Sequence, residues 1–360
     1  MIYLFFYAVL IVLGGLSRVS YSTNLIFSDE YRKILLIIGH VFVFLLIGFR
    51  YEVGGDWWNY LVNYDSFSEL NFYDLNLLNE PLYGAINIVA SIFDLGILFV
   101  NIVCALIFCY CIFKISLYVN VRDRFMVLLV LFPVLVVIVG MGYTRQSVSV
   151  SLAYLAMEYL IRGRIKLFFL FSIISFGFHM SAVAVFLIAA SIRFNIYLLL
   201  IFFMIFITYF GFSFDWAAID AVNYYVNNEI GSAGATFRLF VNLLPSLIYL
   251  ATMNSLQWPV LYKKYILNLS VATILMFAAI FLVPSTTIID RFSFYLMPVQ
   301  YVVFSRIPVL SGKIIDKKLS ISMILIFYVL LLFGIIFISN NFDGWLPYDN
   351  YIIKFPGFLV

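Results

Sequence analysis

The sequence has 360 residues, of which 65% are hydrophobic and 11% charged, and its formal net charge is +3. Because a soluble domain carries about 25% charged residues, this composition excludes a soluble fold and predicts that the excess apolar surface faces lipid. We therefore expect an all-α, polytopic membrane protein with no nucleic-acid partner.

About 20 apolar residues cross a bilayer as a helix, and the chain holds about 11–12 such membrane segments. The first lacks a positively charged start and is interpreted as a retained span, not as a cleaved signal peptide. The candidates are 2–17, 34–49, 95–113, 125–142, 145–161, 167–178 with 179–192, 196–214, 239–256, 265–283, 292–305 and 319–338.

The distribution of Lys and Arg predicts the orientation of these segments. With the N-terminus outside and 167–192 folded as a broken or re-entrant hairpin, all but five of the 21 basic residues face inward. A single straight span at 167–192 would move Lys263, Lys264 and the Lys317–Lys318 pair outside. We therefore expect one transmembrane domain, 1–360, with outer loops at 50–94 and 215–238 and an outer tail at 339–360.

Four of the five outer cations are arginines that lie at span boundaries: Arg50, Arg145, Arg238 and Arg291. Guanidinium groups bind phosphate oxygens through paired donors, and the amides of helix N-termini also favour anions. The alternative is interfacial snorkelling, in which each head group lies among lipid phosphates. The pattern is typical of a site for a lipid pyrophosphate.

The segment after Arg50 places Asp56, Trp57 and Trp58 directly after a Gly54-Gly55 turn. Glycines allow positive φ and close approach of a ligand to the backbone, and tryptophan faces commonly stack on sugar rings. The alternative is an interfacial tryptophan pair that follows a turn.

Two further polar residues are candidates for acid–base chemistry. Glu80 precedes Pro81 at an expected helix start, where its alternative role is to balance the helix dipole. His179 lies at the expected break of the hairpin, beside Gly177, as a base, a hydrogen-bond donor or a satisfied core histidine. No D-x-D pair occurs in the outer loops, so no metal site is expected.

In chain order, the motifs RYEVGGDWWNY, NEPLY, GYTRQSVSVSLA, FHMSA and DRFSFYLMP resemble the EpsG-like branch of the Wzy polysaccharide polymerases. The resemblance covers roughly residues 1–305. It implies a GT-C-type glycosyltransferase in the bacterial cytoplasmic membrane whose active site faces the periplasm or exterior. Such proteins join oligosaccharide repeat units carried on undecaprenyl pyrophosphate into O-antigen, capsule or exopolysaccharide.

The resemblance also implies roles for individual residues. Arg145 and Arg291 would hold the pyrophosphate, assisted by Arg50 and Arg238. The acceptor would be surrounded by Asp56, Glu80 and His179, any of which could be the base, with Asp56 slightly preferred because it follows Arg50 on a flexible turn. The sugar would contact Trp57, Trp58, Tyr60 and Gln146, and no cofactor is implied.

Two other functions compete with the polymerase. An O-antigen ligase uses the same donor with a lipid A core acceptor, and no residue separates the two acceptors. A flippase or transporter would place ionisable groups near the midplane, often in two related halves, and neither feature is evident here. Expected partners are the lipid-linked oligosaccharide, membrane lipids and, as a further candidate, a protein that regulates chain length.

Overall fold

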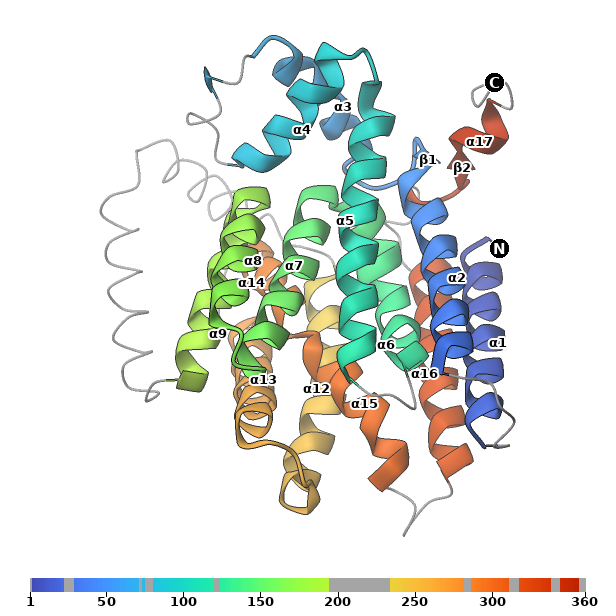
Figure 1. Ribbon diagram of the computed structural model, residues 1–360, viewed down its shortest axis with the longest axis vertical. Coiled ribbons are helices and arrows are strands. Elements are labelled where there is room, and N and C mark those ends of the chain that lie inside the picture. Colours follow the sequence, from blue (N-terminus) through green and yellow to red (C-terminus); the bar gives the residue numbers. More distant parts are fainter. Residues whose placement is uncertain are drawn as a thin grey trace.

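The computed structural model describes residues 2–22, 29–70, 73–74, 80–119, 124–193, 234–281, 286–310, 317–337 and 344–355. These residues form a bundle of helices with one short strand pair (Figure 1), which confirms the all-α membrane class. The predicted span 196–214 and most of the predicted outer loop 215–238 lie outside the described residues.

Seven helices of 18 residues or more make up most of the bundle. They are α1 (Ile2–Ser22), α2 (Asp29–Gly48), α5 (Gly96–Val119), α7 (Thr144–Ile161), α12 (Ala235–Thr252), α13 (Val260–Ala279) and α16 (Lys317–Phe337). Among the described residues, five segments are long and apolar enough to cross a membrane: Asp29–Gly48, Gly96–Val119, Ala235–Ser255, Val260–Ala279 and Lys318–Phe337. The chain is therefore a multi-pass membrane protein.

Shorter helices and turns complete the described structure. They are α3 (Trp57–Ser68), α4 (Pro81–Ile92), α6 (Arg124–Leu131), η2 (Phe132–Gly140), α8 (Ile165–Phe178), η3 (Met180–Ala182), α9 (Val183–Arg193), η4 (Met253–Ser255), α14 (Thr287–Ser293), η5 (Phe294–Leu296), α15 (Pro298–Leu310) and α17 (Tyr351–Lys354).

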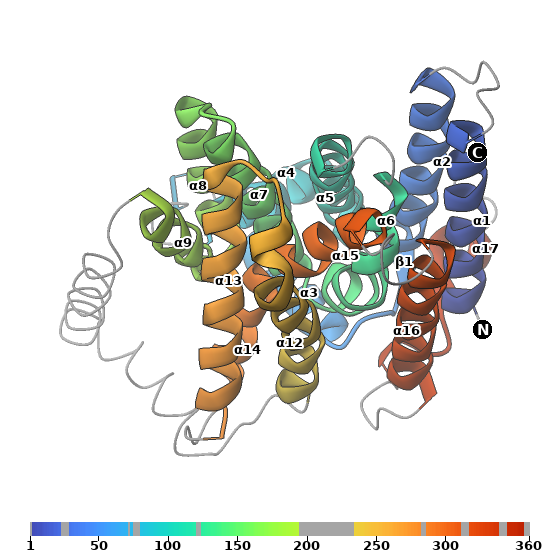
Figure 2. The ribbon, with the colours of Figure 1, turned by 90° about the horizontal axis from the view of Figure 1, so that it is seen from below.

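The most polar of the predicted spans, α7, lies in the interior of the bundle between α5 and α8. Its serines Ser147, Ser149 and Ser151 are buried, and Ser147 and Ser151 donate to carbonyls of the preceding turn. Small side chains let helices approach closely in a membrane. Because its neighbours are helices and not lipid, α7 tolerates a polarity that a lipid-facing helix would not (Figure 2).

The predicted broken hairpin is confirmed. Helix α8 ends at Phe178, His179 has extended backbone (φ −160°, ψ 130°), and one turn of η3 leads into α9. His179 therefore lies where the regular helix of α8 ends, and such irregular backbone is tolerated at membrane depth only inside protein or beside a cavity.

Helices α3 and α4 lie across one end of the bundle (Figure 1). At the same end, strand β1 (Arg50–Tyr51) pairs antiparallel with β2 (Asp349–Asn350), so that Arg50 lies opposite Asn350. The segment that follows α16 thus returns to the loop that precedes α3. Local sequence patterns did not predict this pairing.

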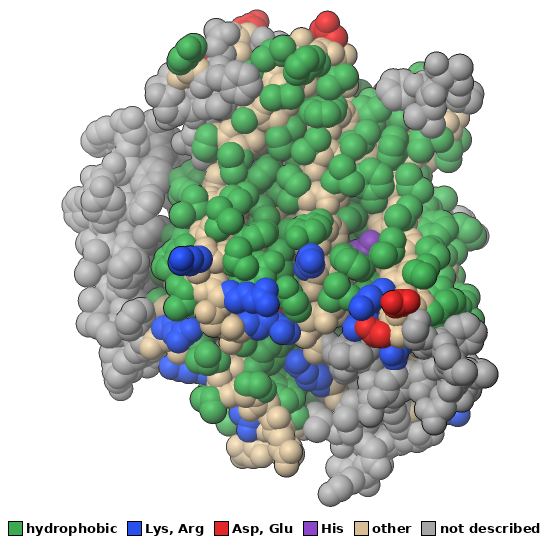
Figure 3. Space-filling model, in the orientation of Figure 1, with side chains coloured by type: hydrophobic (Ala, Val, Ile, Leu, Met, Phe, Trp, Pro, Cys, Tyr) green, Lys and Arg blue, Asp and Glu red, His purple; other side chains and the backbone are tan. Residues whose placement is uncertain are grey.

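On the face that Figure 3 shows, lysine and arginine side chains gather in the half of the molecule away from α3 and α4, with some acidic side chains beside them. At the end formed by α3 and α4, acidic side chains appear without basic ones beside them. Some of the basic residues are anchored, as in the pair of Arg124 with Asp29 at 2.8 Å. Others, such as Arg164 at the start of α8, are exposed. On this face, basic side chains are therefore concentrated away from α3 and α4.

Candidate active site

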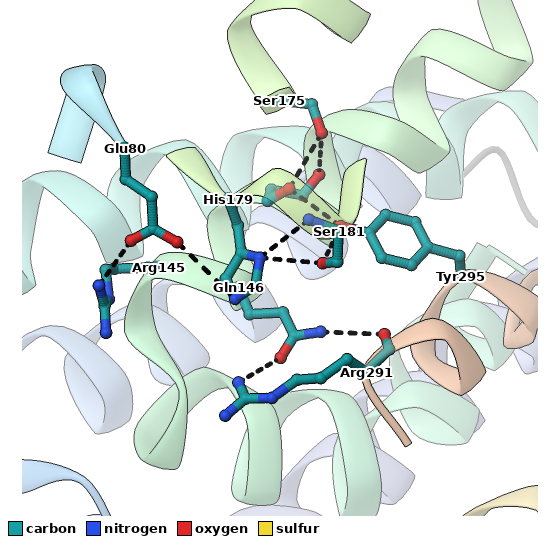
Figure 4. A network of polar contacts seen from close by, with 9 residues as sticks. Glu80, Arg145, Gln146, Ser175, His179, Ser181, Arg291 and Tyr295 are labelled. Atoms are coloured by element: carbon teal, nitrogen blue, oxygen red, sulfur yellow. Dashed lines mark hydrogen bonds and ion pairs between the residues drawn. The ribbon is translucent and has the colours of Figure 1, made fainter. Parts of the chain in front are cut away.

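Four helix ends meet at the end of the bundle that carries α3 and α4. Helix α7 begins at Thr144, with no side-chain cap on its first amides, and α4 begins directly after Glu80. The break between α8 and η3 contributes His179, and α14 contributes Arg291. Figure 4 shows that their side chains point toward one another.

An ion pair between Glu80 and Arg145 lies at the centre of this cluster. Arg145 NH1 donates to Glu80 Oε2 at 2.6 Å, and its guanidinium lies 5.6 Å from the ring centroids of both Tyr60 and Tyr83. The side chain of Glu80 is 14% exposed and that of Arg145 is 33% exposed. The pair is ordered by its neighbours, yet its arginine remains accessible.

A glycine on α8 allows Glu80 to reach this position. A Cβ at Gly177 would lie 2.8 Å from Cγ and Cδ1 of Leu82, which is closer than side chains pack. The absence of that atom lets the first turn of α4 lie against α8, two residues before His179. Gly177 therefore sets the distance between the Glu80 carboxylate and the imidazole.

His179 is held in one tautomer by the turn that follows it. The backbone N–H of Ser181 donates to His179 Nδ1 at 3.1 Å. Since Nδ1 accepts that bond, the neutral ring carries its proton on Nε2, which faces Glu80 Oε1 at 3.8 Å. This geometry favours His179 as a hydrogen-bond donor over His179 as a base.

A chain of hydroxyl groups supports the imidazole from within the bundle. The Tyr295 hydroxyl lies 3.0 Å from Ser181 Oγ and 3.0 Å from Ser149 Oγ, and Ser175 Oγ donates to the Ser149 carbonyl at 2.7 Å. All four side chains are buried, so each hydroxyl needs its partner. The network fixes the hairpin break against α7 and η5.

Arg291 is positioned by a reciprocal pair of hydrogen bonds with Gln146. Arg291 NH1 donates to Gln146 Oε1 at 2.8 Å, and Gln146 Nε2 donates to the Arg291 carbonyl at 3.0 Å. The guanidinium lies 5.0 Å from the ring centroid of Tyr143. No carboxylate pairs with Arg291 within the described ranges, so the cluster has one arginine charge more than its carboxylate balances.

Electrostatics at Glu80 reflect both burial and the two arginines. Burial raises the pKa of the Glu80 carboxyl above its ordinary value, and the opposing effects of Arg145 and Arg291 do not fully cancel this rise. Such a carboxylate is a stronger proton acceptor than one in water. The cluster thus combines two cations for an anion with one group suited to take a proton.

Residues 33–350 match the model of the EpsG family. The chain belongs to the EpsG family. No curated protein and no solved structure matches the chain. The matched range includes Glu80, Arg145, His179 and Arg291, and the family is associated with polymerase-type synthesis of polysaccharides.

The other two predicted pyrophosphate ligands of this EpsG-family chain are buried in other contacts. Arg50 is 0% exposed and donates to the Ile47 carbonyl at 2.8 Å, to Asn101 Oδ1 at 2.9 Å and to Thr144 Oγ1 at 2.7 Å. These contacts join β1 to α2, α5 and the first residue of α7. The structure leaves Arg50 out of contact with any ligand at the cluster, because protein groups surround its guanidinium on all sides.

Arg238 is likewise taken up within the bundle. Its Nε and NH2 both donate to the Asp290 carboxylate at 2.6 Å, and both side chains are less than 10% exposed. The pair holds α14 against α12 and so places Arg291, the next residue, toward Gln146. The structure makes Arg238 a support for α14 and not a group that faces a ligand.

The residues predicted for the sugar fall into different environments. Trp57 and Tyr60 are buried, and Tyr60 faces Arg145, whereas Trp58 is 66% exposed. Gln146 is buried against Arg291. Only Trp58 of these four presents an open ring face.

Asp56, predicted as a base, directly precedes α3 and is half-buried. Asn59 Nδ2 lies 3.4 Å from its Oδ1, a long contact, and no ion pair joins Asp56 to an arginine among the residues that the structure describes. The structure brings Glu80 and His179 together with Arg145. Asp56 lies near Tyr60 and Tyr143 of the site but forms no ion pair with these arginines among the described residues.

Sequence reasoning missed several members of the site in this EpsG chain: Tyr83, Tyr143, Asp290 and Tyr295. Each lies within or next to a motif that was already recognised, such as NEPLY for Tyr83 and DRFSFYLMP for Asp290 and Tyr295. Their adjacency to predicted ligands was the available signal. Their partners are 52 or more residues away in sequence, so the pairings themselves carried no local pattern.

Proposed function

We propose that this protein is a polysaccharide polymerase. It transfers a glycan from undecaprenyl pyrophosphate onto a hydroxyl of another lipid-linked repeat unit at the outer face of the cytoplasmic membrane. The observation that carries the proposal is a pair of partly exposed arginines beside the half-buried Glu80. Arg145 lies in the uncapped first turn of α7, and Arg291, in the last turn of α14, is held against that turn by Gln146.

The proposed orientation rests on the distribution of charge. Basic residues flanking membrane spans are retained on the cytoplasmic side. In this molecule they gather in the half away from α3 and α4, on the face that Figure 3 shows. That arrangement supports a cytoplasmic location for the basic end and an outer location for the cluster around Arg145.

The chemistry proposed for the donor needs charge neutralisation more than proton donation. As the bond between the anomeric carbon and the pyrophosphate oxygen breaks, negative charge builds on the pyrophosphate. Arg145, Arg291 and the first amides of α7 are fixed donors for that charge in a partly desolvated site. Undecaprenyl pyrophosphate then leaves as the anion.

The acceptor hydroxyl forms the new bond to the anomeric carbon and must lose its proton. We assign that proton to Glu80. The incoming pyrophosphate competes for Arg145, which releases the Glu80 carboxylate from its ion pair. His179 then orients the carboxylate through Nε2–H, and Asp56 is the alternative proton acceptor.

The proposal is tested with purified protein in lipid nanodiscs and lipid-linked repeat units, with glycan length as the readout. We expect the wild type to make long chains and Arg145→Ala to leave single units. Arg164→Ala, which removes an exposed arginine at the opposite end, serves as the matched control and should make long chains. Long chains from Arg145→Ala would overturn the assignment.

The same proposal predicts a cellular phenotype that separates the competing functions. Deletion of the gene should leave single capped repeat units at the cell surface. Loss of every capped unit would indicate a ligase. Accumulation of lipid-linked units in the cytoplasmic leaflet of the membrane would indicate a flippase or transporter.

A further inference from the structure

The segment that follows α16 inserts an indole ring into the outer end of the bundle. Trp345 is 8% exposed, and its Nε1 donates to the Val137 carbonyl at 2.8 Å. The Tyr3 hydroxyl donates to the Trp345 carbonyl at 2.7 Å, and the Gly54 amide donates to the Gly344 carbonyl at 2.6 Å. Three hydrogen bonds thus anchor Trp345 and its neighbour Gly344, which no motif singled out.

Glycines on two other segments leave room for the ring. A Cβ at Gly142 would lie 2.8 Å from Cζ2 of Trp345, and a Cβ at Gly55 would lie 3.1 Å from its Cη2. Real side-chain atoms avoid such distances. The Trp345 ring therefore lies directly against the backbone of both segments.

The two glycine segments also touch each other. Gly54 has φ +117°, and a Cβ there would lie 2.2 Å from the Met141 carbonyl oxygen. Positive φ and this close approach both require glycine. The turn at Gly54-Gly55 is therefore stacked on residues 141 and 142, with Trp345 as the side chain that covers the joint.

Each glycine segment leads directly into a part of the proposed site. Asp56 and the exposed Trp58 follow Gly55, and Arg145 lies three residues after Gly142 at the start of α7. A displacement of about 1 Å in a positioned group can lower a reaction rate by about 100-fold. The spacing between these two segments therefore matters for any reaction at the site.

We propose that Trp345 is a positioning residue that fixes the Gly54-Gly55 turn, and with it Asp56 and the start of α3, relative to the start of α7. The consequence for turnover rests on the proposed polymerase function, whereas the positioning itself does not. Trp345 acts through the backbone of Gly55 and Gly142, against which its ring lies.

The positioning is tested by the distance between two spin labels, at Trp58→Cys on α3 and Phe237→Cys on α12. Both side chains are exposed, and the native Cys104, Cys109 and Cys111 are buried and should remain unlabelled. We expect one narrow distance distribution in the labelled parent. Trp345→Ala should broaden it, and Trp345→Phe, which keeps a ring in the gap, should restore most of it.

Trp258→Ala is the matched control, because it also removes a tryptophan ring. Trp258 lies in the turn between α12 and α13, at the opposite end of the bundle, and its ring centroid is 5.6 Å from that of Tyr249. It should leave the distribution narrow. An unchanged distribution in Trp345→Ala, or equal broadening in Trp258→Ala, would overturn the positioning role.

The catalytic consequence is tested by kcat and KM of polymer formation. We expect Trp345→Ala to lower kcat about 10-fold to 100-fold with less than a threefold change in KM. Trp258→Ala should leave both kcat and KM unchanged. Gly142→Ala should lower kcat in the parent but add little in the Trp345→Ala background, because the methyl group then enters vacated space.

The proposal would be contradicted if the double variant lowered kcat by the product of the two single effects. It would also be contradicted if Trp345→Ala kept the wild-type kcat although its distance distribution was broadened. If the wild type makes no polymer, the proposed function fails, and the spin-label distances still decide whether Trp345 holds the turn. The two failures are therefore distinguishable.

Discussion

Two pairs of arginines occupy the same kind of position in the sequence and very different positions in the molecule. Arg145 and Arg291 are partly exposed, whereas Arg50 and Arg238 are buried. The type of partner does not explain the difference, because Arg145 pairs with a carboxylate as Arg238 does, and Arg50 bonds to an amide as Arg291 does. The difference lies in burial: protein encloses one pair on every side and leaves the other pair open to a ligand.

The largest effect should come from breaking a buried pair. Arg238→Ala leaves the Asp290 carboxylate buried without its guanidinium, and we expect a loss of about 3–5 kcal/mol in the free energy of unfolding. Thermal unfolding of the purified protein in detergent measures this. The double variant Arg238→Met with Asp290→Leu should recover most of the loss, and a double variant as unstable as Arg238→Ala would contradict the pairing.

The accessible arginines should show the opposite behaviour. Arg291→Ala removes a fixed donor from the proposed anion site, so we expect the rate of polymer formation to fall about 10²-fold to 10³-fold. The unfolding temperature should change far less than in Arg238→Ala. If Arg291→Ala kept the wild-type rate of polymer formation but had a lower unfolding temperature, Arg291 would have a structural role like those of Arg50 and Arg238.

The contrast between the two pairs shows how much of the molecule could be predicted. The distribution of Lys and Arg predicted the hairpin broken at His179, and the position of Arg145 and Arg291 at span boundaries predicted their common face. Both conclusions rest on local composition and on the fixed geometry of spans. The expectation that Arg291 begins a helix is wrong, because Arg291 lies in the last turn of α14.

Long-range pairings could not be predicted in the same way. Asn101 and Thr144 accept from Arg50 across 51 and 94 residues, and Trp345 bonds to Val137 across 208 residues. Nothing in either partner's local sequence marks such a contact, because many helix packings would satisfy the same hydrophobic pattern. The polar ends of α7 were predicted, but the residues that meet them depend on tertiary packing.

A smaller effect should follow from filling the space between Gly177 and Leu82. Gly177→Ala places a Cβ against Leu82, and we expect about 1–3 kcal/mol of destabilisation together with a lower rate, since Glu80 is displaced from His179. Gly334→Ala on α16 is the matched control, because a Cβ there meets no atom within 4 Å. Equal losses of stability and rate in the two variants would show that the contact between Gly177 and Leu82 does not position Glu80.

The smallest effect concerns pH. A protonated Glu80 cannot accept a proton, and burial raises the pKa of this carboxyl, so the rate should fall as the pH drops through a midpoint above the ordinary pKa of a glutamate. Below that midpoint the decline should be about tenfold per pH unit. Glu80→Gln should lower the rate and remove this acid limb, whereas Asp56→Asn should keep it. An acid limb that persists in Glu80→Gln and disappears in Asp56→Asn would assign the base to Asp56.

The most direct test of the difference between the two arginine pairs is the affinity of the purified protein in nanodiscs for undecaprenyl pyrophosphate itself. We expect the wild type and Arg164→Ala to bind equally well. Arg145→Ala and Arg291→Ala should each bind about 10-fold to 100-fold more weakly, because each loses hydrogen bonds to a charged group. Unchanged affinity in both variants would contradict the claim that these two arginines hold the lipid pyrophosphate.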